Sequence, residues 1–569
     1  MTTLRLHEFA GMKPNPVIAR EGTYRVPRHA APCDLKLDSN EGPLPPEHVL
    51  KAAASAELLR RYPDARALER KLAERLGVAP ECVLTTCGAD DALARACQAL
   101  LWQGRELVLP VPTFEMLPRY AALAGATLRE VPWPAGPFPV DAVLAAMGPH
   151  TGAVALVTPN NPTGAAITRP ELERVAACAG DAALFVDLAY AEFADEDLTQ
   201  AALKYENALV FRTLSKAWGL AGLRVGYVVA RPEVISWLRA TGQPYAVTSP
   251  SVALACAWLD EGEAHMRRGV AQVMGERERL RGELESLGCE ALPSQANFVL
   301  ARPRNAAWLR DGLAGLGIAV RIWPGHARLD GMARITCPAD EDAFARLTRS
   351  LRAVLAPEAL LFDMDGVLAN VRASYRQAIL EAAAAFGTTV TFDEIARKKA
   401  EGNANNDWVV THALLQDGGV DVPFEAVKRE FEARYQGDAS AGRVGLHEAE
   451  TLIPSRELLL RLSARLPLGI VTGRPRADAE RFLARFDISR YFRAIVCMED
   501  APLKPSPEPV LRAMALLGAS SAWLVGDTRD DVTAARAAGV VPLGFGGDDL
   551  VACGAGRTLA SLDELEQLL

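Results

Sequence analysis

Short apolar runs rich in β-branched residues alternate with alanine- and leucine-rich stretches of helical pattern between about residue 35 and residue 350. Such an alternation predicts a sheet layered with helices. The helical pattern over 341–354 closes this part, and the proline within 356–358 discourages helix continuation, so we expect a short linker there. A new apolar strand over 359–362 begins a second alternation that runs to the last residue. The pattern therefore predicts an α/β protein with two domains, at residues 1–354 and 355–569.

Polar side chains follow three predicted strands of the first domain, at the point where each strand ends. These are Asn161 after the run 153–157, Asp187 and Tyr190 after the run 183–186, and Ser215 and Lys216 after the run 208–211. Ligands of open α/β sheets bind in the crevice at the carboxyl ends of the strands. Each residue alone has a structural explanation, as a turn residue, a helix cap or a packed aromatic ring. Their convergence on one crevice favours a binding site.

Lys216 carries the most specific chemistry of this group. It stands where an apolar strand gives way to the glycine-rich turn Lys-Ala-Trp-Gly-Leu-Ala-Gly. Partial removal from water disfavours the ammonium form and leaves the amine free to bond an aldehyde cofactor covalently. An isolated lysine at such a place is more often a surface residue, but the polar neighbours at the adjacent strand ends favour the cofactor interpretation.

The second domain presents a comparable set of residues. Asp363 and Asp365 directly follow the strand 359–362, and the others lie at or beyond two later apolar runs, 468–471 and 522–525. These later residues are Thr472, Lys504, Asp527 and Asp531. An isolated pair of aspartates is commonly a turn or a cap. Four such pieces in this order are hard to explain by structure alone, so they favour one connected functional site.

An insertion of about a hundred residues separates Asp365 from Thr472. It is mostly helical in pattern, including 374–386 and 424–435, and we expect a helical cap at about 370–460. The polar run 398–408 within it is either a loop that selects the substrate or a solvated connection.

Composition and charge narrow the classes of protein. At 569 residues the chain is too long for one core, and half of the residues are apolar, as in an ordinary globular protein. The net charge of −9, without any basic cluster, argues against nucleic acid as a partner. No apolar stretch is long enough for a membrane span, and residues 1–10 lack the apolar run of a signal peptide. Ten scattered cysteines predict buried thiols and a cytoplasmic protein.

The first domain resembles the fold-type-I pyridoxal-phosphate aminotransferases, and within them the histidinol-phosphate aminotransferase family. The shared motifs are 37–41 (Leu-Asp-Ser-Asn-Glu), 61–64 (Arg-Tyr-Pro-Asp), 88–90 (Gly-Ala-Asp), 112–114 (Pro-Thr-Phe), 158–164 (Thr-Pro-Asn-Asn-Pro-Thr-Gly), 212–227, 294–298 (Ser-Gln-Ala-Asn-Phe) and 334–336 (Arg-Ile-Thr). The resemblance implies a large domain with a mixed sheet and a smaller domain beside it.

The resemblance also assigns the cofactor residues. Lys216 would hold pyridoxal phosphate and move a proton on the substrate carbon, Asp187 would pair with the pyridinium nitrogen, and Phe114 would stack on the ring. Asn161 and Tyr190 would bind the ring hydroxyl. The phosphate would lie against Gly88, Ala89, Asp90, Ser215 and Arg224, ahead of a helix predicted over 91–101, and Tyr62 would reach it from the second subunit of a homodimer.

Substrate choice would depend on two arginines. By resemblance Arg334 binds the acidic end of the substrate, Arg321 accompanies it in members that recognise phosphate, and Tyr24 is either a further substrate contact or a packing residue. Two positions depart from the family pattern: Leu188 stands where glutamate is usual, and Ala246 where asparagine is usual. These departures put imidazole-acetol-phosphate in question as the substrate.

The second domain resembles the haloacid-dehalogenase superfamily, with a Rossmann-like core and an inserted helical cap. The resemblance assigns Asp363 as the nucleophile and Asp365 as the acid and base. Thr472 and Lys504 would stabilise the phosphoryl group. A Mg²⁺ site would involve Asp363, Asp365, Asp527 and Asp531. An acid at position 365 indicates a phosphatase, since the dehalogenating members do not need one.

Together the two resemblances predict a bifunctional enzyme. One domain would transaminate a phosphorylated keto compound with an amino-acid donor, and the other would remove the phosphate from the amino product. For the nearest family this means imidazole-acetol-phosphate to histidinol-phosphate, then histidinol. Two alternatives remain open: a first domain like the threonine-phosphate decarboxylases or an aminotransferase of specialised metabolism, and a second domain that is a non-catalytic binding module.

Overall fold

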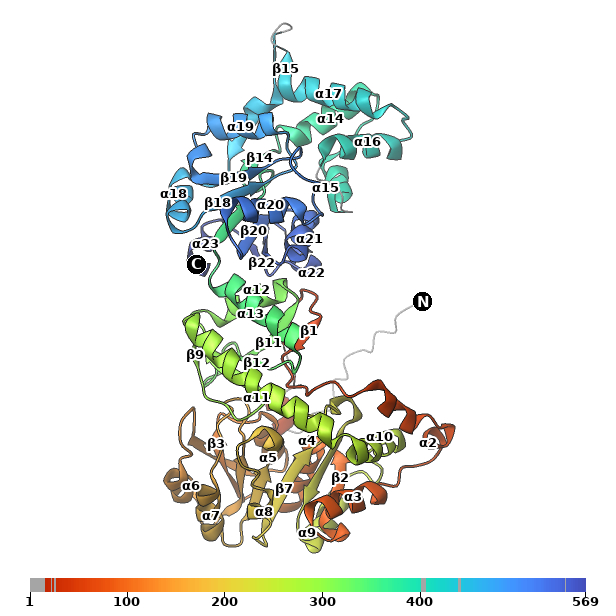
Figure 1. Ribbon diagram of the computed structural model, residues 1–569, viewed down its shortest axis with the longest axis vertical. Helices are drawn as coiled ribbons and strands as arrows, with labels where there is room; N and C mark the ends of the chain where they lie inside the picture. The colour runs from red at the N-terminus through yellow and green to blue at the C-terminus, as the bar shows by residue number, and fades with distance from the viewer. Residues whose placement is uncertain (1–15, 22, 25–26, 401–405, 439–441, 548) are drawn as a thin grey trace.

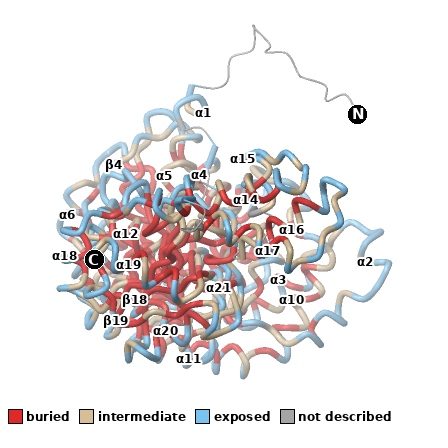
Figure 2. Tube along the Cα trace, turned by 90° about the horizontal axis from the view of Figure 1, so that it is seen from above, coloured by how far each residue is buried: buried red, intermediate tan, exposed pale blue. Residues whose placement is uncertain are grey.

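The computed structural model describes the chain except for residues 1–15, 22, 25–26, 401–405, 439–441 and 548. Figure 1 shows a large α/β unit, a smaller sheet domain next to it, and a second α/β unit from which a group of helices projects. In Figure 2, which looks along the long axis, buried segments gather toward the middle of the view and exposed segments lie mainly at its edge. This is the predicted arrangement of two α/β parts with a helical insertion in the second.

A seven-stranded sheet forms the centre of the large unit, in the order β2-β8-β7-β6-β5-β3-β4. The strands are β2 (Val83–Cys87), β3 (Glu106–Val111), β4 (Thr127–Pro132), β5 (Thr151–Val157), β6 (Ala183–Asp187), β7 (Ala208–Thr213) and β8 (Val225–Val229). Only β8 runs antiparallel to its neighbours. Because β5, β6 and β7 are buried along their whole length, they appear in the sequence as continuous apolar runs. Their carboxyl ends meet at one edge.

Helices cover this sheet and carry the chain to the next unit. They are α1 (Pro16–Glu21), α2 (Ala56–Arg60), α3 (Arg66–Leu76), α4 (Gly88–Leu100), α5 (Met116–Leu123), α6 (Val140–Ala146), α7 (Arg169–Cys178), α8 (Thr199–Ala202), α9 (Pro232–Thr241), α10 (Ser249–Glu261) and α11 (Glu263–Ser286). Local signals set several boundaries: α7 begins at a capping box between Thr168 and Glu171, with proline in its first turn. The long α11 runs from the large unit to the small one (Figure 1).

The small domain contains a five-stranded sheet in the order β1-β11-β12-β10-β9. Its elements are β1 (Leu35–Leu37), β9 (Glu290–Ala291), β10 (Phe298–Arg302), α12 (Ala306–Gly315), β11 (Ile318–Ile322), β12 (Ala333–Thr336) and α13 (Glu341–Leu355). Helix α13 buries Phe344, Leu347, Leu351 and Val354, which recur at helical spacing. Arg321 and Arg334 are paired in register on neighbouring strands.

The second α/β unit has a six-stranded parallel sheet, in the order β19-β18-β13-β20-β21-β22. Its elements are β13 (Ala359–Phe362), α18 (Arg456–Arg465), β18 (Leu468–Val471), α19 (Arg476–Arg485), β19 (Phe492–Val496), α20 (Glu508–Leu517), β20 (Ala522–Gly526), α21 (Arg529–Ala537), β21 (Val541–Phe545), α22 (Asp549–Cys553), β22 (Arg557–Leu559) and α23 (Glu564–Leu568). Strand β13 lies between β18 and β20, so the three strand ends with predicted site residues are adjacent.

The insertion is the helical cap that the sequence predicts. It contains α14 (Tyr375–Ala385), α15 (Phe392–Ala400), α16 (Asp407–Asp417) and α17 (Phe424–Gln436), with the short strands β14 (Ala369–Asn370), β15 (Gly437–Asp438), β16 (Arg443–Val444) and β17 (Thr451–Leu452). Strands β14 and β17 pair with each other where the chain enters and leaves the cap. The predicted loop 398–408 is helical at both ends, and its residues 401–405 lie outside the described part.

A packed boundary joins the two parts of the chain. The rings of Trp308 and Trp523 lie 4.7 Å apart, and each indole donates a hydrogen bond to α13: Trp523 to the carbonyl of Ala353 at 2.8 Å and Trp308 to that of Val354 at 3.2 Å. Arg557 adds an ion pair to Asp311 at 2.8 Å. The link between the parts is therefore a packed surface as well as a short connection.

None of the described helices is long and apolar enough to cross a membrane. All ten cysteines are free thiols, but the expectation that they are buried is wrong for most of them. Only Cys97, Cys289, Cys337 and Cys497 are buried, and Cys178 is exposed because it ends α7 at the protein surface.

Candidate functional site

The first site is a cavity at the carboxyl edge of β5, β6 and β7. It encloses about 230 Å³ between the large and small domains. Its lining includes the predicted residues Tyr24, Ala89, Asp90, Phe114, Asn161, Asp187, Tyr190, Ser215, Lys216, Arg224, Arg321 and Arg334. The ends of β5, β6 and β7 thus meet in one place, as the parallel topology requires, and the small domain adds Arg321 and Arg334.

Lys216 faces this cavity from the loop after β7. Its Nζ donates a hydrogen bond to the carbonyl of Ser39 at 3.1 Å and lies 5.7 Å from the centre of the Tyr190 ring. The side chain keeps contact with solvent through the cavity, although protein surrounds it. Burial, followed by the charge of Arg334, lowers the pKa of Lys216 to about 8. The amine is therefore available for covalent chemistry close to neutral pH.

Asp187 ends β6 as a buried carboxylate that accepts a hydrogen bond from the backbone amide of Ala189 at 3.1 Å. Burial raises the pKa of Asp187 to about 7. A cationic ring nitrogen would compensate such a carboxylate. The Tyr190 hydroxyl accepts a hydrogen bond from Asn40 at 2.9 Å, and Asn161 accepts one from Arg334 at 2.5 Å. Phe114 lines the same cavity, so an aromatic face is available to a flat ring.

The start of α4 forms a cradle for an anion. Gly88 has a φ of +78°, and a Cβ there would lie 2.4 Å from Nη2 of Arg224. A Cβ on Gly226 would come within 2.4 Å of the Ala89 nitrogen, so the two backbones are in close contact. The helix begins at Gly88, three residues before the predicted start, because the glycine turns the chain directly into it. Backbone N–H groups at a helix start suit a phosphate.

Arg224 reaches this cradle from the left-handed φ of 53°, and it also forms an ion pair with Asp90 at 3.1 Å. Ser215 is buried beside it and accepts a hydrogen bond from Thr213 at 2.9 Å. These features fit pyridoxal phosphate part by part. Lys216 suits its aldehyde and Asp187 its ring nitrogen. Phe114 suits the face of the ring, and the cradle at the start of α4 suits the phosphate.

Arg321 and Arg334 are buried residues of the small domain that line the same cavity. Nη1 of Arg321 and Nε of Arg334 have no hydrogen-bond partner among the described residues. Two guanidinium groups thus stand close to the space in which an acidic substrate group could lie.

Two residues of this cavity have no role in the sequence interpretation. Glu115 accepts hydrogen bonds from Trp323 at 2.5 Å and from Arg321 at 3.4 Å. Glu115 follows Phe114 directly, so its position next to a shared motif could have indicated that it lines the cavity. Trp323 follows β11 and no motif marked it.

Tyr24 and Tyr62 occupy different places. Tyr24 lines the cavity, and burial and the nearby Glu115 raise the pKa of its hydroxyl. Tyr62 is 80% exposed and stacks on Tyr245 with ring centres 4.7 Å apart. Tyr62 is thus not among the residues that line the cavity of its own chain, and its assignment to a second subunit stays a prediction.

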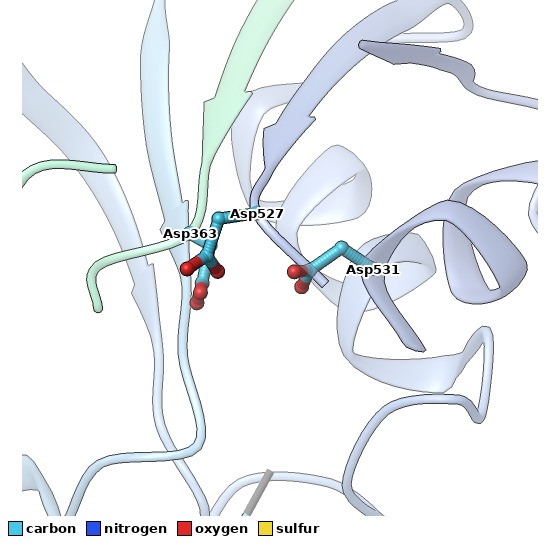
Figure 3. Close-up of side chains that lie close together, drawn as sticks. All are labelled: Asp363, Asp527 and Asp531. Carbon is cyan, nitrogen blue, oxygen red and sulfur yellow. The ribbon is translucent and has the colours of Figure 1, made fainter. Parts of the chain in front are cut away.

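The second site lies at the ends of β13 and β20. Ligand oxygens of Asp363, Asp527 and Asp531 lie within 4.8 Å of one another, and Figure 3 shows the three carboxylates facing a common space. Gly366, with a φ of +79°, leaves room beside them, because a Cβ there would lie 2.0 Å from Asp527. Three clustered carboxylates are a suitable set of ligands for Mg²⁺.

Lys504 is the cation of this site. Its Nζ donates to Asp363 at 2.8 Å, to the carbonyl of Val471 at 3.0 Å and to Asp531. Burial opposes the charge of Lys504, but the two carboxylates outweigh it and raise its pKa above the usual value. Burial also raises the pKa of Asp363 well above its usual range, and Lys504 opposes that shift.

Thr472 and Asp365 complete the predicted set. Thr472 is buried at the end of β18, and its hydroxyl accepts from the amide of Arg474 at 3.1 Å. The Asp365 carboxylate lies outside the group of three and pairs with Arg474 at 2.6 Å. The structure therefore differs from the expectation that the Asp365 side chain joins the cation ligands. Arg474 had no predicted role.

Known proteins resemble both parts of the chain. The family model for class I and II aminotransferases matches residues 34–348, which is more than half of the chain. The chain belongs to the class I and II aminotransferase family. Residues 360–544 match the model of the haloacid-dehalogenase-like hydrolases, so a second enzyme family follows the first.

Individual relatives refine this assignment. Histidinol-phosphate aminotransferase 2 of Burkholderia mallei is 37% identical over 57% of this chain and 92% of its own length. The crystal structure of histidinol-phosphate aminotransferase from Sinorhizobium meliloti, in complex with pyridoxal-5'-phosphate, has a TM-score of 0.53 and 26% identity over 60% of this chain and 98% of its own. An imidazoleglycerol-phosphate dehydratase of Phytophthora nicotianae is 49% identical over 33% of this chain, and the match spans only 43% of that relative. The predicted family membership and fold of both parts are confirmed.

Proposed function

We propose that this aminotransferase uses pyridoxal phosphate to transaminate a phosphorylated keto compound, and that its hydrolase domain removes the phosphate from the amino product with Mg²⁺. The observation that carries the proposal is that Arg321 and Arg334, paired on neighbouring strands, both line the cavity of Lys216. Two guanidinium groups suit a phosphate dianion better than they suit one carboxylate. We assign imidazole-acetol-phosphate and glutamate as the substrates, with histidinol-phosphate as the product.

In the first site, bound pyridoxal phosphate supplies an electron sink for the bond between the substrate α-carbon and its proton. Lys216 would hold the cofactor and would also move that proton. Asp187 keeps the ring nitrogen protonated, while Asn161 and Tyr190 orient the ring oxygen. Arg334 fixes the acidic end of the substrate. These assignments rest on the positions of the side chains and on the family.

The names of the relatives support the substrate class. One relative is named for histidinol phosphate and another for imidazoleglycerol phosphate, and both compounds are phosphorylated imidazole derivatives. Leu188 and Ala246 remain departures from the family pattern, and Leu188 is buried in the core. The substrate screen described below therefore extends beyond histidinol-phosphate.

The second site would hydrolyse a phosphomonoester in two steps. Asp363 attacks phosphorus, the bond from phosphorus to the alcohol oxygen breaks, and Asp365 gives that oxygen a proton. Asp365 then takes a proton from water, which attacks phosphorus, releases phosphate and restores Asp363. Mg²⁺ held by Asp363, Asp527 and Asp531 would neutralise the phosphate, and Lys504 and Thr472 would stabilise the charge on the transferring group.

We also propose a homodimer in which Tyr62 reaches the phosphate cradle of the partner. Large apolar side chains are exposed near Tyr62 in sequence: Leu44 is 86% exposed, Leu50 65% and Leu59 79%. An exposed apolar surface of this kind suits an interface. For the domains we propose 1–354 and 355–569, with the cap at about 370–460, in a cytoplasmic protein.

The test separates the two activities with two variants. Purified wild-type protein, Lys216→Ala and Asp363→Asn are each given pyridoxal phosphate, glutamate, MgCl₂ and a panel of keto phosphates and amino-alcohol phosphates. We expect Lys216→Ala to lose 2-oxoglutarate formation and keep phosphate release from histidinol-phosphate, and Asp363→Asn to do the reverse. The proposal fails if the wild type shows neither activity with any phosphorylated compound. Carbon dioxide release from a phosphorylated amino acid would instead favour a decarboxylase.

A further inference from the structure

Arg474 carries a buried guanidinium in the loop that follows β18. Its side chain is 1% exposed, and it lies between two carboxylates. Nε and Nη2 both contact Oδ1 of Asp365 at 2.6 Å, while Nη1 and Nη2 donate to the two oxygens of Glu450 at 3.1 Å each. With two acids already bound, this arginine is not available to bind a substrate phosphate.

Glu450 is itself fixed by residues of the cap. It is 3% exposed and accepts hydrogen bonds from Ser374 at 2.9 Å and from Tyr435 at 3.1 Å. Ser374 precedes α14 and Tyr435 belongs to α17, whereas Glu450 directly precedes β17, where the chain leaves the cap. The guanidinium of Arg474 also lies 4.9 Å from the ring centre of Tyr375. The contacts of Arg474 therefore join the core loop to both ends of the cap.

The two oxygens of Asp365 are unequal in this arrangement. Both nitrogen contacts from Arg474 go to Oδ1, and among the described residues Oδ2 has no hydrogen-bond partner. A carboxylate held at one oxygen by a rigid fork presents the other in a defined direction. The cavity beside it is lined by Asp365, Tyr375, Asn406, Trp408, Arg474 and Met498, among others, so cap and core both border the space next to Asp365.

We propose that Arg474 is a positioning residue for the phosphatase reaction: it holds Oδ1 of Asp365, leaves Oδ2 to transfer the proton, and makes this alignment depend on the cap through Glu450. The inference rests on the proposed phosphatase function, in which Asp365 protonates the departing alcohol. Loss of this alignment should slow only some substrates. An alcohol that is a poor leaving group needs the proton from Asp365, whereas p-nitrophenolate leaves without it.

The test compares kcat/KM for histidinol-phosphate with kcat/KM for p-nitrophenyl phosphate, in the full-length protein with MgCl₂. This constant reports the steps up to departure of the alcohol. Loss of aligned general acid catalysis costs about 10²–10⁴-fold. We expect Arg474→Gln to lower kcat/KM for histidinol-phosphate by about 100-fold while p-nitrophenyl phosphate changes little. Arg474→Lys restores the charge without the fork and should recover part of the loss, and Glu450→Gln should show a weaker loss of the same selectivity.

Arg476→Gln is the matched control, because Arg476 lies two residues further on, is 41% exposed and pairs with Asp500. Its ratio of the two kcat/KM values should equal that of the wild type. The positioning role would be overturned if Arg474→Gln and Arg474→Lys lowered kcat/KM equally for both substrates while thermal unfolding stayed unchanged. It would also be overturned if neither variant lowered kcat/KM for histidinol-phosphate. Asp365→Asn without leaving-group selectivity, or a wild type that releases no phosphate, would instead refute the proposed function itself.

Discussion

Nζ of Lys504 lies 2.8 Å from Oδ1 of Asp363, and both side chains are almost completely buried, at 1% and 6% exposed. The same nitrogen contacts Asp531, so one lysine offsets two of the three carboxylates that face each other. Removing one member of a buried ion pair leaves uncompensated charge and commonly costs about 3–5 kcal/mol.

Lys504→Met should therefore destabilise the second domain and make its stability depend on Mg²⁺. We expect a lower melting temperature without metal, a larger upward shift on adding MgCl₂ than in the wild type, and a loss of phosphate release of about 100-fold or more. Differential scanning calorimetry with and without MgCl₂ measures the first two effects. Arg461→Met, which removes a surface pair with Glu566 in the same domain, is the control. A variant that melts like the wild type in metal-free buffer would contradict this prediction.

Asp187 should make the affinity for pyridoxal phosphate depend on pH. Its pKa is raised to about 7 by burial, so it loses its charge as the pH falls below that value and can no longer pair with a ring cation. We expect wild-type affinity to decrease between pH 8 and pH 6, and Asp187→Asn to bind about 2–5 kcal/mol more weakly at pH 8 with a flatter pH profile. Equilibrium absorbance titrations measure both.

Comparing the two proteins at each pH cancels the titrations of the cofactor itself. Asp141→Asn, which alters a surface pair with Arg174, should behave like the wild type. Parallel pH profiles for the wild type and Asp187→Asn would show that another group controls cofactor binding.

The rate of covalent attachment to Lys216 should rise with pH. Because burial and Arg334 lower the pKa of Lys216 to about 8, the reactive free amine increases as the pH rises through that value. Arg334→Gln removes one of the two main causes, so its rate profile should move to higher pH. Stopped-flow absorbance after mixing the cofactor-free enzyme with pyridoxal phosphate gives the profile, and Arg174→Gln serves as a distant control. An unchanged midpoint in Arg334→Gln would refute the assigned electrostatic cause.

Arg321→Gln should discriminate between the two substrates of transamination. Hydrogen bonds to charged groups contribute about 1.5–3 kcal/mol, so we expect kcat/KM for the keto phosphate to fall by about 10–100-fold. The half-reaction with glutamate should fall less, since Arg334 still binds one carboxylate. Single-turnover measurements of each half-reaction test this, with Arg328→Gln at the exposed pair to Glu130 as the control. Equal losses in both half-reactions would contradict a role of Arg321 in phosphate recognition.

The tryptophans at the boundary between the two parts should contribute strongly to stability. Trp523 is completely buried against Trp308, and truncation of a buried tryptophan costs about 3–5 kcal/mol. Trp523→Phe keeps most of the ring and loses the bond to the Ala353 carbonyl, for about 1 kcal/mol. Urea unfolding followed by circular dichroism compares these variants with Trp102→Phe, at a 53% exposed position. Similar unfolding of Trp523→Ala and the wild type would show that the boundary is not part of the cooperative unit.

Most of the strand ends that carry the two sites could be predicted from the sequence alone. Buried parallel strands such as β6 and β13 are continuous apolar runs, and the residues that follow them lie at one edge of a sheet by topology. Asp187 and Asp363 were found in this way, each directly at the end of its run. Two of the cap helices, α14 and α17, were predicted within one residue at each end, whereas α15 and α16 were not predicted.

Only the tertiary structure decided which charges meet across these edges. Arg474 and Asp365 are 109 positions apart, Arg321 and Glu115 are 206 apart, and the Trp308–Trp523 contact joins two different domains. No periodicity relates such positions, because local spacing reports the face of one helix or strand and not its neighbour. The sequence by itself therefore determined the two folds and the location of their sites, whereas packing decided the partners of each buried charge, since a buried ion is stable only beside the group that compensates it.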